Sequence, residues 1–221
     1  MENVKTILKW LNSQRNEANI AGMKRFGIET STAFGIKMPV LRAKAKEIKK
    51  NMELSLELWQ SGFHEARMIA GFIADPKKIT EKDMDEWVKD FNSWDICDVV
   101  CFGVFCKTDL YDKKIIEFAS NESEYIRRAA FAMIAGMALT NKKLPDEAYL
   151  KYFDLIEKYA FDPRNFVKKA VNWSLRQIGK RNISLGIKAI EVSERLLQQP
   201  YKSSHWIAND ALRELKCKWK I

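Results

Sequence analysis

Apolar residues recur every three to four positions along most of the chain, which is the spacing of amphipathic helices. No segment alternates apolar and polar residues over the roughly six positions of a convincing strand. The interruptions are short and polar, and each ends near a Ser, Thr, Asp or Pro that can begin a helix. They are "GIETSTAFGIKMP", "DPKKITEKD", "TNKKLPDEA", "FDPRN" and "QQPYKSS". The pattern predicts an all-α protein of roughly a dozen helices of about 8 to 18 residues.

Several predicted helices begin with similar residues. "YIRRAAFAMIAG" starts at residue 125 and "FVKKAVNWSLRQIG" at residue 166, and both open with an aromatic residue, a β-branched residue and two bases. "HWIANDALREL" at residue 205 and "HEARMIAGFI" at residue 64 are weaker relatives. A period near forty residues built from two helices is typical of HEAT-type solenoids. We therefore expect one domain over residues 1–221, a right-handed superhelix of HEAT-like repeats.

The chain carries a net charge of +9, from 38 Lys and Arg against 29 Asp and Glu. This excess favours a polyanionic partner such as nucleic acid. The charge is concentrated in one predicted helix, since no Asp or Glu lies between Pro163 and Ile190. Helical spacing gives this helix a packing stripe of Val167, Val171, Ser174 and Ile178. A second stripe consists of Lys169, Trp173, Arg176 and Lys180, with Lys168 beside it.

Trp173 is thus predicted to lie among cations and away from the core. A tryptophan is ordinarily a core residue, and lysine stems that partly cover it on a solvated face are the second alternative. We favour a nucleic-acid surface, because cations neutralise phosphates and an aromatic ring meets a sugar or a base.

Two other basic segments support a nucleic-acid surface. "IKMPVLRAKAKEIKK" carries Arg42 and Lys44 among six bases, with one acid. "YIRRAA" supplies Arg127 and Arg128, and Arg128 is expected beside small alanines, where it reaches a phosphate or a carboxylate. A plain solvated arginine is the alternative.

Trp94 and Asp98 lie four residues apart in "FNSWDICDVV", so they project from one face of the predicted helix. Asn92 and Asp95 are expected to cap this helix, which gives Asp95 a structural role that Asp98 lacks. Asp98 is then either an acid that stabilises the helix dipole or part of a site.

Four cysteines show no paired spacing, and the longest apolar run, residues 129–139, is far too short to span a bilayer. No basic segment followed by an apolar stretch starts the chain, so nothing resembles a signal peptide. We expect a reduced cytoplasmic protein without a membrane segment. Cys97 and Cys101 are one helical turn apart, but neither of the two histidines is near them in sequence. Buried thiols are therefore expected in place of a metal site.

With these motifs in order, the chain resembles the AlkD-like DNA alkylation repair proteins, a HEAT-repeat superfamily of DNA glycosylases. The motifs are "MKRF" at 23–26, "FGIKMP" at 34–39, "SWDICD" at 93–98, "YIRRAA" at 125–130, "FVKKAVNWSLR" at 166–176 and the closing "WIANDALREL". The resemblance implies removal of N3- or N7-alkylated purines from double-stranded DNA by a monomer without a cofactor. It implies Trp94, Asp98 and Trp173 as the catalytic residues, meeting on the basic inner wall of the superhelix.

The DNA-binding set combines the basic residues above with residues that the resemblance implies. It consists of Arg128, Arg127, Phe26, Lys168, Lys169, Arg176, Lys180, Arg42 and Lys44. Active members tend to carry tyrosine where this chain has Phe26, and often a second tryptophan where it has Ser93. Two alternatives stay open: a non-catalytic member that binds damaged or branched DNA, and a scaffold for protein partners.

Overall fold

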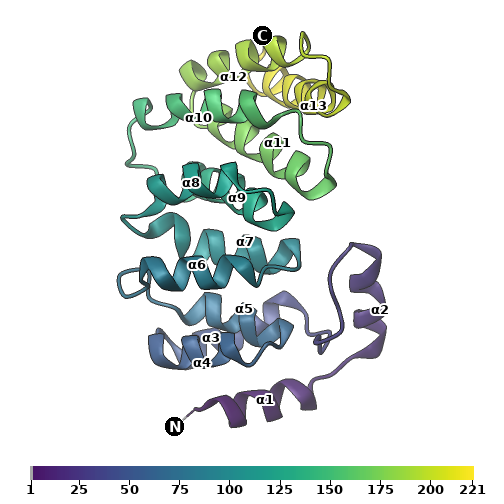
Figure 1. Ribbon diagram of the computed structural model, residues 1–221, viewed down its shortest axis with the longest axis vertical. Helices are drawn as coiled ribbons and strands as arrows, with labels where there is room; N and C mark the ends of the chain where they lie inside the picture. Colours follow the sequence, from purple (N-terminus) through teal and green to yellow (C-terminus); the bar gives the residue numbers. More distant parts are fainter. Residues whose placement is uncertain (1) are drawn as a thin grey trace. The chain divides into compact units, whose positions relative to one another are not determined.

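The computed structural model describes residues 2–221, and every regular element in that range is helical (Figure 1). The α-helices in order are α1 (Val4–Ser13), α2 (Glu17–Arg25), α3 (Met38–Ile48), α4 (Met52–Gln60), α5 (His64–Ile73), α6 (Glu81–Lys89), α7 (Trp94–Gly103), α8 (Tyr111–Ser120), α9 (Glu124–Thr140), α10 (Glu147–Tyr159), α11 (Asn165–Gly179), α12 (Ile183–Leu196) and α13 (Lys202–Trp219). A 3-10 turn, η1 (Phe105–Lys107), follows α7. The predicted all-α class is confirmed, and each repeat motif falls at the beginning of a helix.

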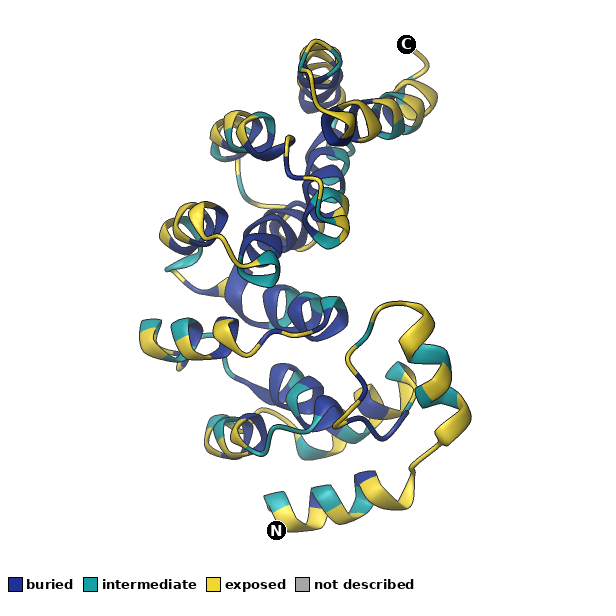
Figure 2. Cartoon of the chain, turned by 45° about the vertical axis from the view of Figure 1, so that its right-hand side comes forward, coloured by how far each residue is buried: buried dark blue, intermediate teal, exposed yellow. Residues whose placement is uncertain are grey.

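The chain divides into two compact units, Met1–Leu110 and Tyr111–Ile221. Most helices bury one side and expose the other, whereas α2 has no buried residue (Figure 2). This is the arrangement that the three-to-four-residue spacing predicts. The prediction of a single domain over residues 1–221 stays a prediction.

In the first unit, α5 packs against α3, α4 and α7. The aromatic core of the first unit lies beside these helices. There the rings of Trp59 and Trp87 stack with centroids 4.2 Å apart. Phe91 and Phe105 pack around that pair. These buried rings fix α4, α6 and η1 against one another, because each ring removes a large apolar area from water.

In the second unit, α9, α11 and α13 run in the same direction. Contacts between α11 and α13 advance together along both helices, from Lys168 with Trp206 to Asn172 with Asp210. The outer helices α8 and α12 pack on α9 and α13 respectively. Pairs of helices whose second members lie parallel are the unit of HEAT-like repeats.

A buried carboxylate holds the connection between α2 and α3. Glu65, in the first turn of α5, is fully buried and accepts hydrogen bonds from the backbone N–H groups of Phe34, Gly35 and Ile36, at 2.7 to 3.1 Å. A buried carboxylate is tolerated where several N–H donors satisfy it. The polar break "GIETSTAFGIKMP" is therefore a fixed segment, and it holds the end of α2 near the start of α7.

Gly35 → Ala is expected to destabilise this anchor by about 2 kcal/mol or more. Gly35 has a φ of 76°, and a Cβ there would lie 2.4 Å from the backbone oxygen of Asn16. Urea unfolding of both proteins measures the loss. Gly22 → Ala is the matched control, because nothing lies within 4 Å of a Cβ at Gly22, inside α2. Equal stabilities for wild type and Gly35 → Ala would contradict the expectation.

Candidate functional site

The exposed face of α7 begins with Trp94, the first residue of the helix. Trp94 and Asp98 are both partly exposed, whereas Ile96, Val99 and Val100 are buried. The predicted separation of this helix into a packing side and a side that carries an indole and a carboxylate is thus confirmed. A carboxylate one turn after an indole can stabilise a cation that lies against both.

The turn after α2 is docked onto the start of α7 by two hydrogen bonds. The indole Nε1 of Trp94 donates to the carbonyl oxygen of Phe26 at 3.1 Å, and the backbone N–H of Glu29 donates to Ser93 Oγ at 2.8 Å. The Phe26 side chain remains 71% exposed. Ser93 therefore positions the segment that presents Phe26, a role that the sequence did not indicate. The only signal for it was a hydroxyl directly before Trp94.

The predicted capping pair of α7 is wrong. The N-cap residue is Ser93 and Asn92 is exposed before it, so Asn92 does not cap the helix. The Asp95 carboxylate instead lies 3.0 Å from Nε2 of His64, and both side chains are buried. Asp95 has a structural role, as expected, but the role is to join α7 to α5.

Three cysteines lie on the packing side of α7 and in η1, and all three are buried: Cys97, Cys101 and Cys106. The sulfur atoms of Cys97 and Cys101 are 4.0 Å apart. Burial raises the pKa of the Cys101 thiol well above its ordinary value, which keeps it protonated. The expectation of buried thiols is confirmed. Within residues 2–221, no group of three or more His, Cys, Asp or Glu side chains is placed to hold a metal ion.

Trp173 lies in the third turn of α11. The predicted packing stripe is confirmed, because Val167, Val171, Ser174 and Ile178 are fully buried. Trp173 is only partly exposed, so it is neither a core residue nor a solvated one. The Gln177 amide oxygen, in the orientation that satisfies its neighbours, accepts a hydrogen bond from the indole Nε1 at 3.2 Å. One edge of the ring is thereby fixed by its own helix.

Two of the cations predicted beside Trp173 are paired within the protein. Glu214 of α13 forms ion pairs with Arg176 and, at 2.7 Å, with Lys180. Burial opposes ionisation of Glu214, but hydrogen bonds and charge from Lys180 and Arg176 outweigh it and lower the pKa of the carboxyl. The stripe is therefore less basic than α11 alone suggested. Lys169 is the exposed cation of the stripe, and the Lys168 ammonium lies 4.7 Å from the Trp206 ring.

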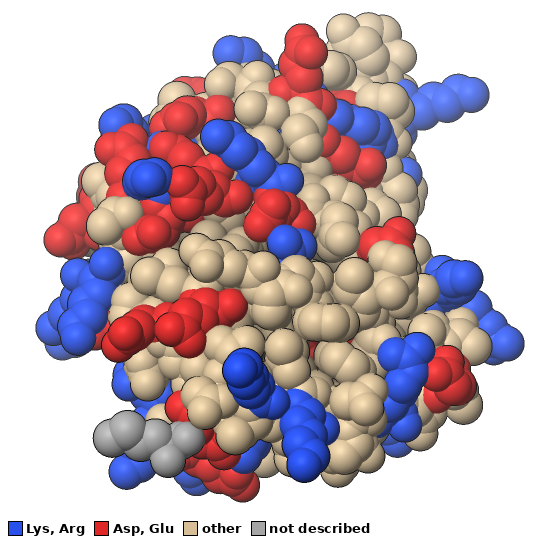
Figure 3. Space-filling model, turned by 60° about the horizontal axis from the view of Figure 1, so that its bottom comes forward, with Lys and Arg blue, Asp and Glu red and all other residues tan. Residues whose placement is uncertain are grey.

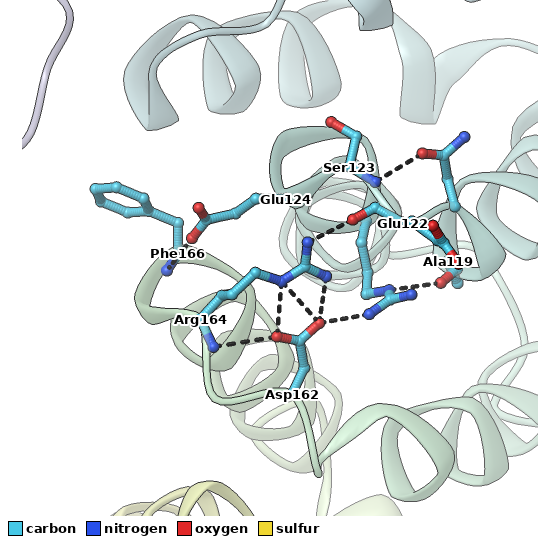
Figure 4. Close-up of polar contacts among 9 residues, drawn as sticks. Ala119, Glu122, Ser123, Glu124, Asp162, Arg164 and Phe166 are labelled. Atoms are coloured by element: carbon cyan, nitrogen blue, oxygen red, sulfur yellow. Dashed lines mark hydrogen bonds and ion pairs between the residues drawn. The ribbon is translucent and has the colours of Figure 1, made fainter.

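Arg127 and Arg128 are both buried, so the alternative of a plain solvated arginine at position 128 is wrong. Arg127 Nη1 lies 2.5 Å from the Asp162 carboxylate, and Arg127 Nε donates to the carbonyl oxygen of Ala119 (Figure 4). Arg128 Nη1 donates to the carbonyl oxygen of Phe166 at 2.8 Å. The two arginines tie α9 to the loop and helix of the next repeat, so a phosphate contact by Arg127 would require this ion pair to open.

The loop before α11 is a second ionic anchor. The Arg164 guanidinium holds the Asp162 carboxylate from the other side and donates to the carbonyl oxygen of Glu122 (Figure 4). Burial disfavours the charged form of Asp162, but hydrogen bonds from Arg164 and Arg127 outweigh burial and lower the pKa of the carboxyl. This carboxylate is therefore ionised near neutral pH.

In α3, Arg42 and Lys44 face different surroundings. The Lys44 ammonium pairs with Glu2 at 2.7 Å and with Glu47 at 3.3 Å, and the hydrogen bond that it donates to Glu2 raises its pKa. Arg42 is exposed and lies over the Phe72 ring. On the face drawn in Figure 3, acidic side chains are interspersed with basic ones. Lys44 is thus partly neutralised, whereas Arg42 keeps an accessible charge.

Comparison with known proteins places this geometry in context. Residues 7–215 match the model of a family described as "DNA alkylation repair enzyme". A solved structure described as "A new family of proteins related to the HEAT-like repeat DNA glycosylases with affinity for branched DNA structures" is similar, with a TM-score of 0.76 and 22% sequence identity. The match covers 87% of this chain and 83% of that one. The HEAT-like fold is thereby confirmed. A sequence comparison with curated proteins finds no match.

A membrane-spanning segment was not expected from the sequence. Within residues 2–221, no helix has both the length and the apolar character that crossing a bilayer requires.

Proposed function

Because the chain belongs to the DNA alkylation repair enzyme family, we propose that it is a DNA glycosylase. Its proposed substrate is duplex DNA that carries an N3- or N7-alkylated purine, and its reaction is hydrolysis of the N-glycosidic bond. The observation that carries the proposal is the exposed face of α7, where Trp94 and Asp98 are one turn apart and the exposed Phe26 is docked beside them.

The chemistry fits this pair of side chains. Alkylation at N3 or N7 places a positive charge on the purine, which weakens the glycosidic bond, so little protonation of the leaving base is needed. The demand on the protein is to stabilise the positive charge that develops on the deoxyribose. The Asp98 carboxylate and the Trp94 indole both stabilise a cation, and Asp98 can also orient or deprotonate the attacking water.

The other residues are proposed to bind substrate. Trp173, held by its own helix through Gln177, is proposed as an aromatic contact for the DNA on the second unit. Lys168, Lys169 and Arg42 supply phosphate contacts. No cofactor is proposed, because the hydrolysis needs only water and a carboxylate, and the protein is proposed to act as a monomer in the cytoplasm.

The direct test is release of 7-methylguanine from a defined duplex, measured by chromatography of the free base. The wild-type protein is expected to release the base faster than the spontaneous rate, in proportion to the protein concentration. Release at the spontaneous rate over a range of protein concentrations would overturn the proposal.

A second candidate function is binding of branched or damaged DNA without base excision. It is favoured by the similar solved structure, whose description includes affinity for branched DNA structures. Both functions use the same cations, so charge does not discriminate between them. Base release does: a protein that binds a four-way junction more tightly than a duplex, and releases no alkylated base, has the second function.

The salt dependence of DNA binding tests the phosphate contacts and distinguishes a DNA-binding protein from a protein-binding scaffold. Lys169 → Ala is expected to lower the slope of log affinity against log salt by about 0.9, the value for one phosphate contact on a duplex. Lys180 → Ala is expected to change the slope less, because Glu214 already pairs with Lys180. Fluorescence anisotropy with a duplex at several salt concentrations measures both slopes. Weak binding with a flat slope in the wild type would favour the scaffold.

A further inference from the structure

Three aromatic residues mark the beginnings of the three parallel helices in the second unit. They are Tyr125 in α9, Phe166 in α11 and Trp206 in α13. The Tyr125 and Phe166 rings stack with centroids 5.6 Å apart and planes inclined by 26°. The Lys168 ammonium, half a turn after Phe166, lies 4.7 Å from the Trp206 ring centroid. The repeat therefore places an aromatic side chain at the same end of each parallel helix.

These rings are partly open to solvent. Trp206 is 40% exposed, and Tyr125 and Phe166 are partly exposed. A large aromatic ring that only fills a core is normally buried more completely, and adjacent repeats have buried their apolar stripes elsewhere. Packing between the helices therefore does not explain why Tyr125, Phe166 and Trp206 remain partly exposed.

The middle ring is held in place from both sides of its backbone. The N–H of Phe166 donates to the Glu124 carboxylate at 3.1 Å, and its carbonyl oxygen accepts from Arg128 at 2.8 Å. The loop just before it is fixed by the Asp162–Arg164 ion pair. Figure 4 shows the Phe166 ring directed away from this polar network. The ring is therefore oriented before any ligand arrives, which lowers the entropic cost of binding.

We propose that Tyr125, Phe166 and Trp206 form a stacking surface for an unpaired DNA strand, with Lys168 and Lys169 as contacts for its phosphates. Flat rings interleaved with cations are the common chemistry of single-strand binding, because every base has a face that stacks on an aromatic ring. Bases in an intact duplex are already stacked on one another, so they do not reach such rings. The proposal rests on the proposed function only for DNA as the partner.

Charge argues for this occupant over a protein segment. The helix that carries Phe166 has no acid from its first residue to its last, and Lys169 in its first turns is exposed. The carboxylate of Glu124 already accepts the Phe166 N–H, which limits its repulsion of a phosphate. A nucleic-acid strand supplies both the faces that match the rings and the negative charges that match the lysines.

The test compares a fluorescein-labelled oligothymidylate of about 16 nucleotides with a duplex of the same length, by anisotropy at fixed salt. Replacing both Phe166 and Trp206 with leucine is expected to weaken binding of the single strand by about 10-fold or more, and binding of the duplex by less than about 2-fold. Leucine keeps apolar bulk and removes the flat ring. Phe161 → Leu is the matched control, since Phe161 is also 40% exposed but its ring contacts Tyr159 and Tyr201.

Two single variants guard against misfolding. Trp206 → Leu changes an exposed residue and is expected to weaken binding of the single strand but not of the duplex. Phe166 → Tyr keeps a ring and is expected to bind both like the wild type. The proposal is overturned if the wild type does not bind the single strand, or if the leucine variants bind it as well as the wild type or lose no more than Phe161 → Leu. Base release from the alkylated duplex is measured in parallel and is expected to persist in the leucine variants. Loss of base release in the wild type would overturn the glycosylase proposal and leave this one standing.

Discussion

Asp98 → Asn is expected to lower the rate of 7-methylguanine release by about 100-fold or more, the effect of removing one preorganised group that stabilises developing charge. The asparagine has the same shape and removes only the negative charge that is proposed to stabilise the deoxyribose cation. Single-turnover base release with protein in excess measures the effect on the chemical step. DNA affinity is expected to stay the same or to rise, because a negative charge is removed from a surface that meets phosphates.

Two other variants make this result specific to Asp98. Asp109 → Asn removes an exposed acid of the same unit and is expected to release base at the wild-type rate. Asp95 → Asn disturbs the buried contact with His64 and is expected to lower stability, with little effect on the rate per folded molecule. If Asp98 → Asn released base as fast as the wild type, Asp98 would have no catalytic role. If Asp109 → Asn were as slow as Asp98 → Asn, the lower rate would reflect the net charge of the protein and not the position of Asp98.

The elements of the fold were predictable because each depends on residues that are close in sequence. The stripe from Val167 to Ile178 repeats with helical spacing, so its burial follows from α11 alone. The repeat near forty residues was visible in the openings of α9, α11 and α13, because equivalent positions in a solenoid meet equivalent neighbours.

The charge of the candidate surface was predicted less well, because ion pairs between repeats depend on the register between adjacent helices. Arg176 meets Glu214, 38 residues later, and Arg127 meets Asp162 in the next loop. Helical periodicity says nothing about such a register. A signal did exist, since Asp210 and Glu214 have on α13 the same four-residue spacing that Asn172 and Arg176 have on α11. Acids one repeat away must therefore be counted before a helix is described as basic.

The candidate site itself was predicted in its residue types but not in its supports. Trp94 and Asp98 were recognised from their spacing of one turn. The bonds that place Phe26 beside them, from Trp94 and through Ser93, join segments more than sixty residues apart and leave no periodic trace. Supports of this kind are individual hydrogen bonds, so they become visible only in the folded chain.

Asp162 → Asn is expected to lower the free energy of unfolding by about 3 kcal/mol at neutral pH, the largest effect on stability that we expect. The side chain is buried and holds both Arg127 and Arg164, and the substitution leaves the buried Arg127 without its carboxylate. Breaking one side of a buried ion pair is costly, because the remaining charge has lost its partner but not its burial. Urea unfolding measures the change. Asp154 → Asn, at an exposed acid of the same unit, is the control and is expected to change stability by less than about 0.5 kcal/mol.

The same ion pair predicts a dependence on pH. Because the pKa of Asp162 is lower in the folded protein, its contribution is fully present above its ordinary value of about 3.9 and is lost as the pH falls through the lower, folded value. The stability difference between wild type and Asp162 → Asn is therefore expected to be constant from neutral pH to about pH 5 and to shrink below about pH 4. A difference that stayed constant down to pH 2 would mean that the lost stability comes from packing around residue 162 and not from its charge.

Because Arg127 and Arg164 fix the loop that leads into Phe166, Asp162 → Asn is also expected to weaken binding of a single strand more than binding of a duplex.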